Sequence, residues 1–262
     1  MSFFRPNKLP RLMVAPNGAR PQKKNHPEVP ITVSEIVYTG KACFEAGAEA
    51  IHFHTRDKNE KHVLDPGLCK EALRELNKLV PKMHLQITTE AVGRYSPEEM
   101  RKLAYDVMPP GISIGIREMI PSRKPTSEDI KFYNKLTEEG TKIQHICYES
   151  QDIDLLSELL DKAKLKGSSV WCMFVLGHYS GEVSKPEKII HFIEKLKINS
   201  IDADWAVCAF GKEEITCLST AIKLGGKIRV GFENSMLMPD GSIAPNNETK
   251  VKAASFLFEK NL

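Results

Sequence analysis

A (β/α)8 barrel is the fold that this sequence predicts, and three observations favour it. Short β-rich runs alternate with amphipathic segments, and this strand-then-helix unit occurs eight times along the chain. The strand segments are apolar enough to suit a parallel sheet. The length of 262 residues suits one such barrel, which typically needs about 250 residues. An open, doubly wound sheet is the alternative that shares this alternation.

The predicted strands are short runs of β-branched and other apolar residues. They comprise residues 12–15, 50–54, 83–88, 111–116, 142–148, 169–176, 205–210 and 227–232. The predicted helices are residues 31–46, 66–79, 97–107, 127–138, 153–164, 186–196, 212–224 and 247–258. Ser96 and Thr126 directly precede two of these helices, and acidic residues follow them in the first turn. Side-chain oxygens at such positions cap free backbone N–H groups, and the helix dipole favours the negative charge.

Composition predicts a single domain over residues 1–262, because no linker, low-complexity tract or run of like charges divides the chain. The 37 basic and 34 acidic side chains give a net charge of +3. This balance argues against partners such as nucleic acid or an anionic membrane surface. The basic cluster at residues 20–24 is interpreted, for its lysines, as a solvated loop.

The cysteines and the amino terminus predict a soluble, cytoplasmic protein. The six cysteines show no C-x-x-C spacing, and most lie inside apolar runs, where a cysteine behaves as a small hydrophobic residue. The first residues lack the apolar core of a signal peptide. No segment approaches the roughly 20 apolar residues that span a bilayer.

Polar residues at the carboxyl ends of the predicted strands are the candidate site residues, because barrel active sites lie at that end. They are Asn17, Arg20, His52, His54, Arg56, Asp57, Thr88, Thr89, Glu90, Arg117, Glu118, Glu149, His178, Tyr179, Lys212, Glu233 and Asn234. His178 follows a strand and a glycine, and it fits either a site residue or an exposed loop histidine.

His52 and His54 are the strongest signal among these candidates. Alternate residues of a strand share a face, so both imidazoles point the same way and supply half of a zinc site. The alternative is a pair of hydrogen-bonded polar side chains at the end of a core strand. Glu233 ends the run 229–233 on the last strand and shares strand parity with Arg229, so it can supply a third ligand and leave one coordination position open.

Other polar residues offer roles that the sequence does not rank. Thr88 and Thr89 suit hydrogen bonding to a substrate carboxylate or carbonyl, although threonine is also an ordinary strand residue. Glu90, Glu118 and Glu149 suit a general base or a support for a histidine. The alternative for each acid is an ion pair with a nearby arginine or lysine.

The sequence resembles the β-keto acid cleavage enzymes, also called 3-keto-5-aminohexanoate cleavage enzymes, over nearly its whole length. The matching motifs, in order, are residues 15–20 (APNGAR), 26–27 (HP), 30–32 (PIT), 46–48 (AGA), 52–57 (HFHTRD), 86–90 (QITTE), 205–211 (WAVCAFG) and 229–234 (RVGFEN).

The resemblance implies a zinc-dependent barrel that condenses a β-keto acid with acetyl-CoA and yields acetoacetate and a new acyl-CoA. It implies that zinc is held by His52, His54 and Glu233, that Arg229 is the family's strand-eight arginine, and that Thr88 holds the substrate carboxylate. Zinc would polarise the β-keto oxygen while a base removes a proton from the acetyl-CoA methyl group. The family also forms homo-oligomers. We expect Arg229, Glu90 and Glu149 among the catalytic residues, and substrate contacts from Arg20, Asn17, Thr88, Thr89 and Asn234.

Two residues depart from the branch of the family that cleaves aminohexanoate. That branch has an aspartate base where this chain has Asn234, and an amide cannot accept the proton. Arg20 stands where that branch has an acidic residue toward the substrate amine. A guanidinium pairs with a carboxylate and repels an ammonium, so we expect a neutral or anionic β-keto acid as substrate.

Two other functions remain compatible with the sequence. One is a zinc-dependent aldolase or hydrolase that uses no CoA, because no CoA-binding signature is recognisable. The other is a non-catalytic barrel that binds a metal or metabolite. The role of Arg229 is also open, because four residues of strand would place it about 13 Å from Glu233 at about 3.3 Å per residue, unless a bulge or its long side chain closes the gap.

Overall fold

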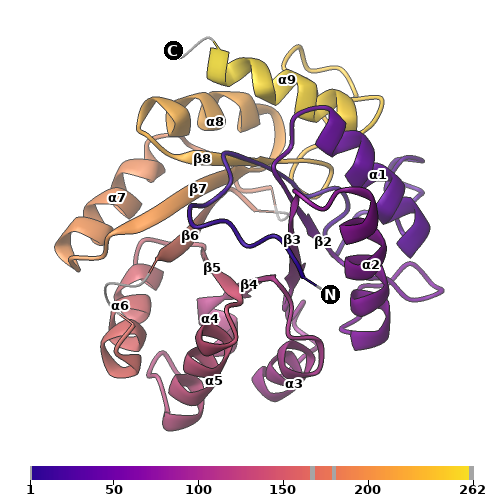
Figure 1. Cartoon of the computed structure of the whole chain (residues 1–262). Coiled ribbons are helices and arrows are strands. Elements are labelled where there is room, and N and C mark those ends of the chain that lie inside the picture. Colours follow the sequence, from indigo (N-terminus) through magenta and orange to yellow (C-terminus); the bar gives the residue numbers. More distant parts are fainter. Residues whose placement is uncertain (1, 166–168, 179–180, 260–262) are drawn as a thin grey trace.

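The computed structural model describes residues 2–165, 169–178 and 181–259, and its strands form a closed barrel with the helices outside it (Figure 1). Each strand pairs in parallel with the next, and β8 closes the ring on β1. The strands are β1 Leu12–Val14, β2 Ala50–Phe53, β3 His84–Thr88, β4 Gly111–Gly115, β5 Lys142–Cys147, β6 Val170–Leu176, β7 Ala203–Ala209 and β8 Lys227–Val230. The predicted (β/α)8 barrel is therefore confirmed.

The helices follow the strands in the predicted order. They are α1 Val33–Glu45, α2 Pro66–Leu79, α3 Pro97–Val107, α4 Ile116–Met119, α5 Ser127–Glu138, α6 Asp152–Ala163, α7 Lys188–Ile198, α8 Glu214–Lys223 and α9 Asn247–Glu259. The bounds of α2, α3 and α5 agree with the prediction, because a capping residue, with proline in two of the three helices, marks each start. The short α4 was not predicted, since one turn carries no amphipathic period. Among the described helices, none is long and apolar enough to cross a membrane.

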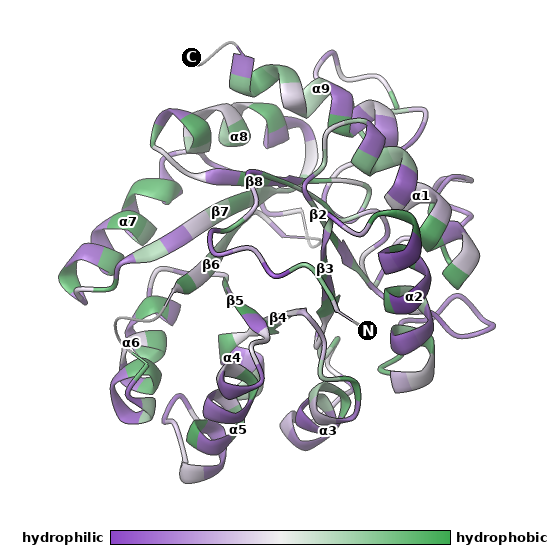
Figure 2. Ribbon diagram, in the orientation of Figure 1, coloured by the Kyte–Doolittle hydropathy of each residue, from purple (hydrophilic) through white to green (hydrophobic). Residues whose placement is uncertain are grey.

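The two largest hydrophobic clusters of the described residues lie on opposite sides of the barrel wall. Outward-facing strand residues pack against the apolar faces of the helices, which carry both hydrophobic and hydrophilic residues along their length (Figure 2). A smaller cluster fills the barrel interior and consists of Leu9, Ile146, Trp171, Met173, Val175, Ala206 and Cys208. The interior of the barrel is therefore packed with side chains, as is usual for this fold.

The amino-terminal segment closes the barrel at the end opposite the predicted site. This segment crosses the ring of strands in Figure 1. The backbone N–H of Leu9 donates to Asp204 at 2.9 Å, and the Leu9 side chain is 2% exposed within the interior cluster. Leu9 thus forms the floor of the barrel.

The carboxyl end of β8 differs from the prediction, because the strand ends at Val230 and not at residue 232. Gly231 follows with a φ of +134°, and a Cβ there would lie 2.2 Å from the backbone oxygen of Ala15. The N–H of Asn234 then donates to the Gly231 carbonyl at 3.0 Å. Glu233 therefore lies in a turn, and the strand parity from which we predicted its direction was wrong.

Candidate active site

A cavity of about 340 Å3 opens at the carboxyl ends of the strands. Its wall contains side chains from around the ring, including His52 of β2, Thr88 of β3, Tyr148 after β5 and Phe210 after β7. Polar and charged groups dominate this wall, as expected for the active end of a (β/α)8 barrel.

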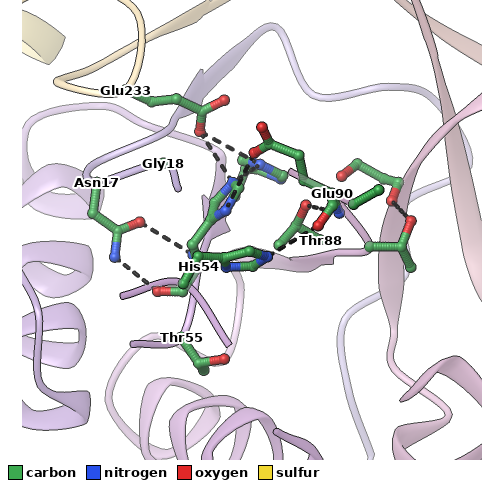
Figure 3. A network of polar contacts seen from close by, with 12 residues as sticks. Asn17, Gly18, His54, Thr55, Thr88, Glu90 and Glu233 are labelled. Carbon is green, nitrogen blue, oxygen red and sulfur yellow. Dashed lines mark hydrogen bonds and ion pairs between the residues drawn. The ribbon is translucent and has the colours of Figure 1, made fainter. Parts of the chain in front are cut away.

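The His52, His54 and Glu233 side chains converge in the wall of this cavity, and Figure 3 shows the last two of them. The Nε2 atoms of the two histidines lie 3.0 Å apart, and each is 3.5 Å from Oε2 of Glu233. Ligands about 2.1 Å from a tetrahedral ion lie about 3.4 Å from one another, so these separations fit a metal ion. Oε2 of Glu233 is buried and has no hydrogen-bond partner among the described residues, which is the condition of an oxygen directed at a ligand.

Burial keeps both imidazoles in the form that a metal requires. Desolvation lowers the pKa of His52 well below its ordinary value despite the opposing charge of Glu233. Desolvation, followed by the charges of His62 and Arg56, lowers the pKa of His54 in the same way. Neutral imidazoles offer a lone pair, so the three side chains could hold a divalent cation.

Arg229 reaches this cluster because the chain turns back at Gly231. Its Nη2 donates to Oε1 of Glu233 at 2.8 Å and to the Cys208 sulfur at 3.4 Å. The distance of about 13 Å that four residues of strand would impose is therefore absent. Arg229 holds one oxygen of the carboxylate and leaves the other to the histidines.

The loop after β1 is fastened to the end of β2 by two side chains. The Asn17 amide accepts from the His54 N–H at 3.1 Å and donates to the His54 and Pro30 carbonyls at 2.8 and 2.9 Å. Arg56 donates from Nη2 to the carbonyls of Asn17 and Pro21, at 3.2 and 2.9 Å, and also to that of Gly18. Since the backbone engages the Asn17 amide and this residue is absent from the cavity wall, the structure argues against the predicted substrate contact.

Gly18 is the residue at which this loop packs against Glu233. Its φ is +57°, and a Cβ there would lie 2.4 Å from Cγ of Glu233. Only glycine allows the carboxylate side chain to pass so close to the loop. The motif at residues 15–20 therefore shapes the cluster through its backbone.

The three acids that the sequence could not rank lie in different surroundings. Oε2 of Glu90 is 3.6 Å from Nδ1 of His54, and desolvation, followed by the charges of Glu233 and Glu118, raises the pKa of Glu90 to about 8. Burial likewise raises the pKa of Glu118, whose Oε2 accepts from the Ala91 N–H at 3.1 Å.

Glu149 is the acid farthest from a catalytic environment. Its side chain is 63% exposed and pairs with Arg117 at 3.3 Å. Arg117 in turn donates to both oxygens of the buried Asp152. This arrangement matches the ion-pair alternative for Glu149.

Thr88 and Thr89 also lie in different surroundings. Thr88 lines the cavity, and its hydroxyl accepts from the Glu90 N–H at 2.9 Å, which leaves its proton to donate elsewhere. The Thr89 hydroxyl is fully buried and donates to the Ser113 carbonyl at 3.0 Å. The predicted substrate contact of Thr89 is not supported, because its side chain points away from the cavity wall and serves the pairing of β3 with β4.

The remaining predicted residues lie around the mouth or behind the cluster. Arg20 and His178 line the cavity, and the charge of Arg20 opposes part of the rise in pKa that desolvation causes at Glu90 and Glu118. Asn234 is 5% exposed and absent from the cavity wall, and among the described residues its amide atoms have no hydrogen-bond partner. Tyr179 lies outside the described residues.

Gln86 is one of the residues at the site for which the sequence predicted no role. Oε1 of Gln86 lies 2.9 Å from Nδ1 of His52. Gln86 is directly opposite His52 in the pairing of β2 with β3. Its position two residues before Thr88 on the neighbouring strand was the available signal, because residues two apart share a face.

The fold and the cavity define a (β/α)8-barrel enzyme with its site at the carboxyl ends of the strands. A family model described as beta-keto acid cleavage enzyme matches residues 11–261. The chain belongs to this family.

Two curated relatives cover most of the chain. A 3-oxoadipate:acetyl-CoA acetyltransferase of Cupriavidus necator is 26% identical over 95% of this chain and 88% of its own length. A 3-keto-5-aminohexanoate cleavage enzyme of Acetoanaerobium sticklandii is 25% identical over 88% of this chain and 84% of its own.

Among solved structures, the binary complex of ObcA with oxaloacetate superposes with a TM-score of 0.69 over 88% of this chain. Its sequence is 15% identical, so the similarity concerns the fold alone. This chain spans 63% of that ObcA chain.

Proposed function

We propose that this protein is a zinc-dependent enzyme that exchanges acyl groups between a β-keto acid and acetyl-CoA, giving acetoacetate and a new acyl-CoA. The observation that carries the proposal is the convergence of His52, His54 and Glu233, with one carboxylate oxygen directed at two neutral imidazoles. The names of both curated relatives fit this reaction class, and one of them specifies acetyl-CoA.

Atom balance selects the carbon that must be deprotonated. Attack by the acetyl-CoA methyl carbon on the ketone, followed by cleavage of the old bond, would give acetate and a 3-ketoacyl-CoA. Attack by C2 of the keto acid on the thioester carbonyl instead releases the CoA thiolate. The thiolate then attacks C3, the C2–C3 bond breaks, and C2 is reprotonated to give acetoacetate. We therefore place the proton transfer at C2 of the keto acid, and the expectation that the base acts on the acetyl-CoA methyl group was wrong; no oxidant or reductant is needed.

Side chains of this chain would bind the keto acid and move that proton. A bound zinc ion would act as a Lewis acid on the β-keto oxygen and make C2 more acidic. Thr88 has a free hydroxyl proton in the cavity for the substrate carboxylate. Glu90 is the candidate base that geometry favours, because it lies in the cavity wall beside His54.

Arg20 favours a substrate whose distal end is neutral or anionic. It lines the cavity mouth and places a guanidinium there, which pairs with carboxylates. The name of one relative supports this class, since 3-oxoadipate is a β-keto dicarboxylate. Comparing turnover of 3-oxoadipate and 3-keto-5-aminohexanoate, each with acetyl-CoA, tests the proposal. Faster use of the amine would contradict it.

The zinc content of the purified protein tests the metal site directly. We expect about one zinc per chain and its loss when His52 and His54 are changed to alanine. Acetoacetate that forms only in the presence of acetyl-CoA would distinguish this reaction from that of an aldolase or hydrolase. A protein that binds no zinc would overturn the metal site. A cytoplasmic location and a homo-oligomeric state remain predictions, which cell fractionation and light scattering test.

A further inference from the structure

Three buried polar side chains form a row across the barrel interior beneath the metal-site cluster. Nδ1 of His52 on β2 lies 2.9 Å from Oε1 of Gln86 on β3. Nε2 of Gln86 donates to Oε1 of Gln144 on β5 at 3.1 Å. Both glutamines are fully buried. Removing two amides from water is costly unless they bond to each other or to a neighbour, so this row requires a reason.

The intervening strand β4 lets the two glutamines meet. Its Ser113 and Gly115 line the cavity, and Gly111 is opposite Gln86 in the strand pairing. A Cβ at Gly111 would lie 2.4 Å from the His84 ring, so this alternate position also faces the interior. The inward face of β4 is therefore glycine, serine and glycine, and long side chains from β3 and β5 can bond across it.

The direction of this row determines which nitrogen of His52 carries the proton. Because Gln86 uses its NH2 group toward Gln144, its carbonyl oxygen is the group that faces His52. With the Gln86 amide in this orientation, Nδ1 of His52 is the donor, because a carbonyl oxygen only accepts. Nε2 then has its lone pair, and Nε2 is the atom that lies 3.5 Å from Glu233 Oε2.

We propose that Gln86, held by Gln144, is a positioning residue that fixes the tautomer and the ring plane of His52 for metal binding. The inference rests on the proposed metal site but adds a residue outside the ligand set. The two histidines then have different outer partners, since Nδ1 of His54 is 3.6 Å from the Glu90 carboxylate. A neutral amide supports one imidazole and an acid lies beside the other. Of the two histidines, only His52 loses a partner when Gln86 is removed, and Gln144 loses its donor.

Variants of Gln86 separate positioning from packing. Gln86→Leu removes the acceptor, and outer partners of this kind are worth about 10–100-fold in metal affinity. We expect the zinc dissociation constant, measured by competition with a chromogenic chelator, to rise by this factor. Gln86→Glu keeps an oxygen acceptor toward His52 and is expected to restore most of the affinity. Gln144→Leu keeps the direct contact but frees the Gln86 amide to rotate, so its affinity should lie between these two.

Imidazole 15N spectra of the metal-free protein provide a readout that does not depend on zinc. We expect the wild type to show His52 with its hydrogen on Nδ1, and Gln86→Leu to lose this signature while Gln86→Glu retains it. A folded Gln86→Leu protein with the wild-type tautomer and unchanged zinc affinity would overturn the proposal. If the wild type binds no zinc, the proposed function fails, and the tautomer comparison still decides the role of Gln86. If Gln86→Leu does not fold, Gln144→Leu decides it by the same two measurements.

Discussion

Arg229 holds Oε1 of Glu233 at 2.8 Å, while Oε2 of the same carboxylate faces two histidine nitrogens at 3.5 Å. The two residues are four apart in sequence, and the turn that begins at Gly231 brings them together. An arginine bound to one oxygen limits the rotation of the carboxylate. The contact therefore prepares Glu233 to act as a ligand through a single oxygen.

Arg229→Met should weaken the metal site without removing any ligand. The freed carboxylate can rotate away from the histidines, and loss of such an outer partner typically costs about 10–100-fold in metal affinity or activity. Zinc affinity and kcat measured on the same preparation check this prediction. Arg229→Lys is the matched control. Its zinc affinity and kcat should fall less, because an ammonium still reaches the carboxylate as a point charge. Wild-type affinity in Arg229→Met would contradict this role.

Gly18→Ala should displace Glu233, because the new Cβ would lie 2.4 Å from Cγ of that side chain. We expect lower zinc affinity together with a loss of stability of about 1–2 kcal/mol from the positive φ. Gly225→Ala is the control, since Gly225 has a φ of +85° and nothing within 4 Å of its added Cβ. Gly225→Ala should lose stability and keep its zinc affinity. Equal zinc affinities in the two variants would show that Gly18 does not position Glu233.

Changing each candidate acid to glutamine should identify the base. We expect Glu90→Gln to lower kcat by about 10²–10⁴-fold, the range for loss of a general base. Glu149→Gln should stay within about twofold of the wild type, because this side chain is 63% exposed and pairs with Arg117. Metal content measured in parallel separates loss of the base from loss of zinc. A large effect at Glu149 with none at Glu90 would reverse the assignment.

Arg20→Glu should reverse the preference for the distal group of the substrate. The new carboxylate attracts an ammonium and repels a second carboxylate, so the kcat/KM ratio of 3-oxoadipate to 3-keto-5-aminohexanoate should fall at least about tenfold, or about 1.4 kcal/mol. Arg20→Gln is the control for the added charge, because Glu90 and Glu118 already face this position. The kcat/KM ratio of Arg20→Gln should lie between those of the wild type and Arg20→Glu. An unchanged ratio would place the distal group elsewhere.

Lys250→Met should destabilise the part of the chain that follows β8. Nζ of Lys250 donates to buried Glu214 at 2.6 Å and to the Leu237 carbonyl at 2.7 Å. Leaving Glu214 without its partner should cost about 3–5 kcal/mol in the free energy of unfolding, measured with urea. The double variant Glu214→Gln/Lys250→Met should be more stable than the single one.

The pH dependence of Lys250→Met provides a second check. Desolvation raises the pKa of Glu214 to about 7 even with Lys250 opposing the shift. Without Lys250, the folded state binds a proton that the unfolded state has released above the ordinary glutamate pKa. The variant should therefore lose stability as the pH rises from about 4.5 through the folded pKa. A pH profile parallel to that of the double variant would contradict this account.

The sequence predicted the elements of the fold well because their signals are local. Ser96, Thr126 and Asp65 each cap a helix start through a hydrogen bond to a backbone N–H, and all three of those helices began as predicted. The ends of strands depend on contacts with other segments. The end of β8 at Val230 depends on the close approach of Gly231 to Ala15, which no local pattern contains.

The roles of the site residues were likewise predictable where the signal is local and not where it depends on contacts with other segments. The convergence of His52 and His54 was predicted from strand geometry, which a sequence displays directly, and it is present although β2 ends at Phe53, one residue before His54. The partners of Asn17 and Thr89 are backbone groups on other elements, so a polar residue at a strand end could not be assigned to substrate or to scaffold. The contact between Gln86 and His52 needed the register of β2 on β3, which only the folded barrel provides.

Because Leu9 closes the amino-terminal end of the barrel, both reactants of the proposed reaction enter at the carboxyl ends of the strands. Two reactants that share one opening must bind in a fixed order when the smaller one lies deeper in the cavity. A keto acid held beside His52 and His54 would be covered by the bulkier thioester, so binding should be ordered, with acetyl-CoA second. Acyl-CoA must then leave before acetoacetate can escape. The closed amino-terminal end of the barrel would in this way determine the order of substrate binding and product release at the carboxyl end.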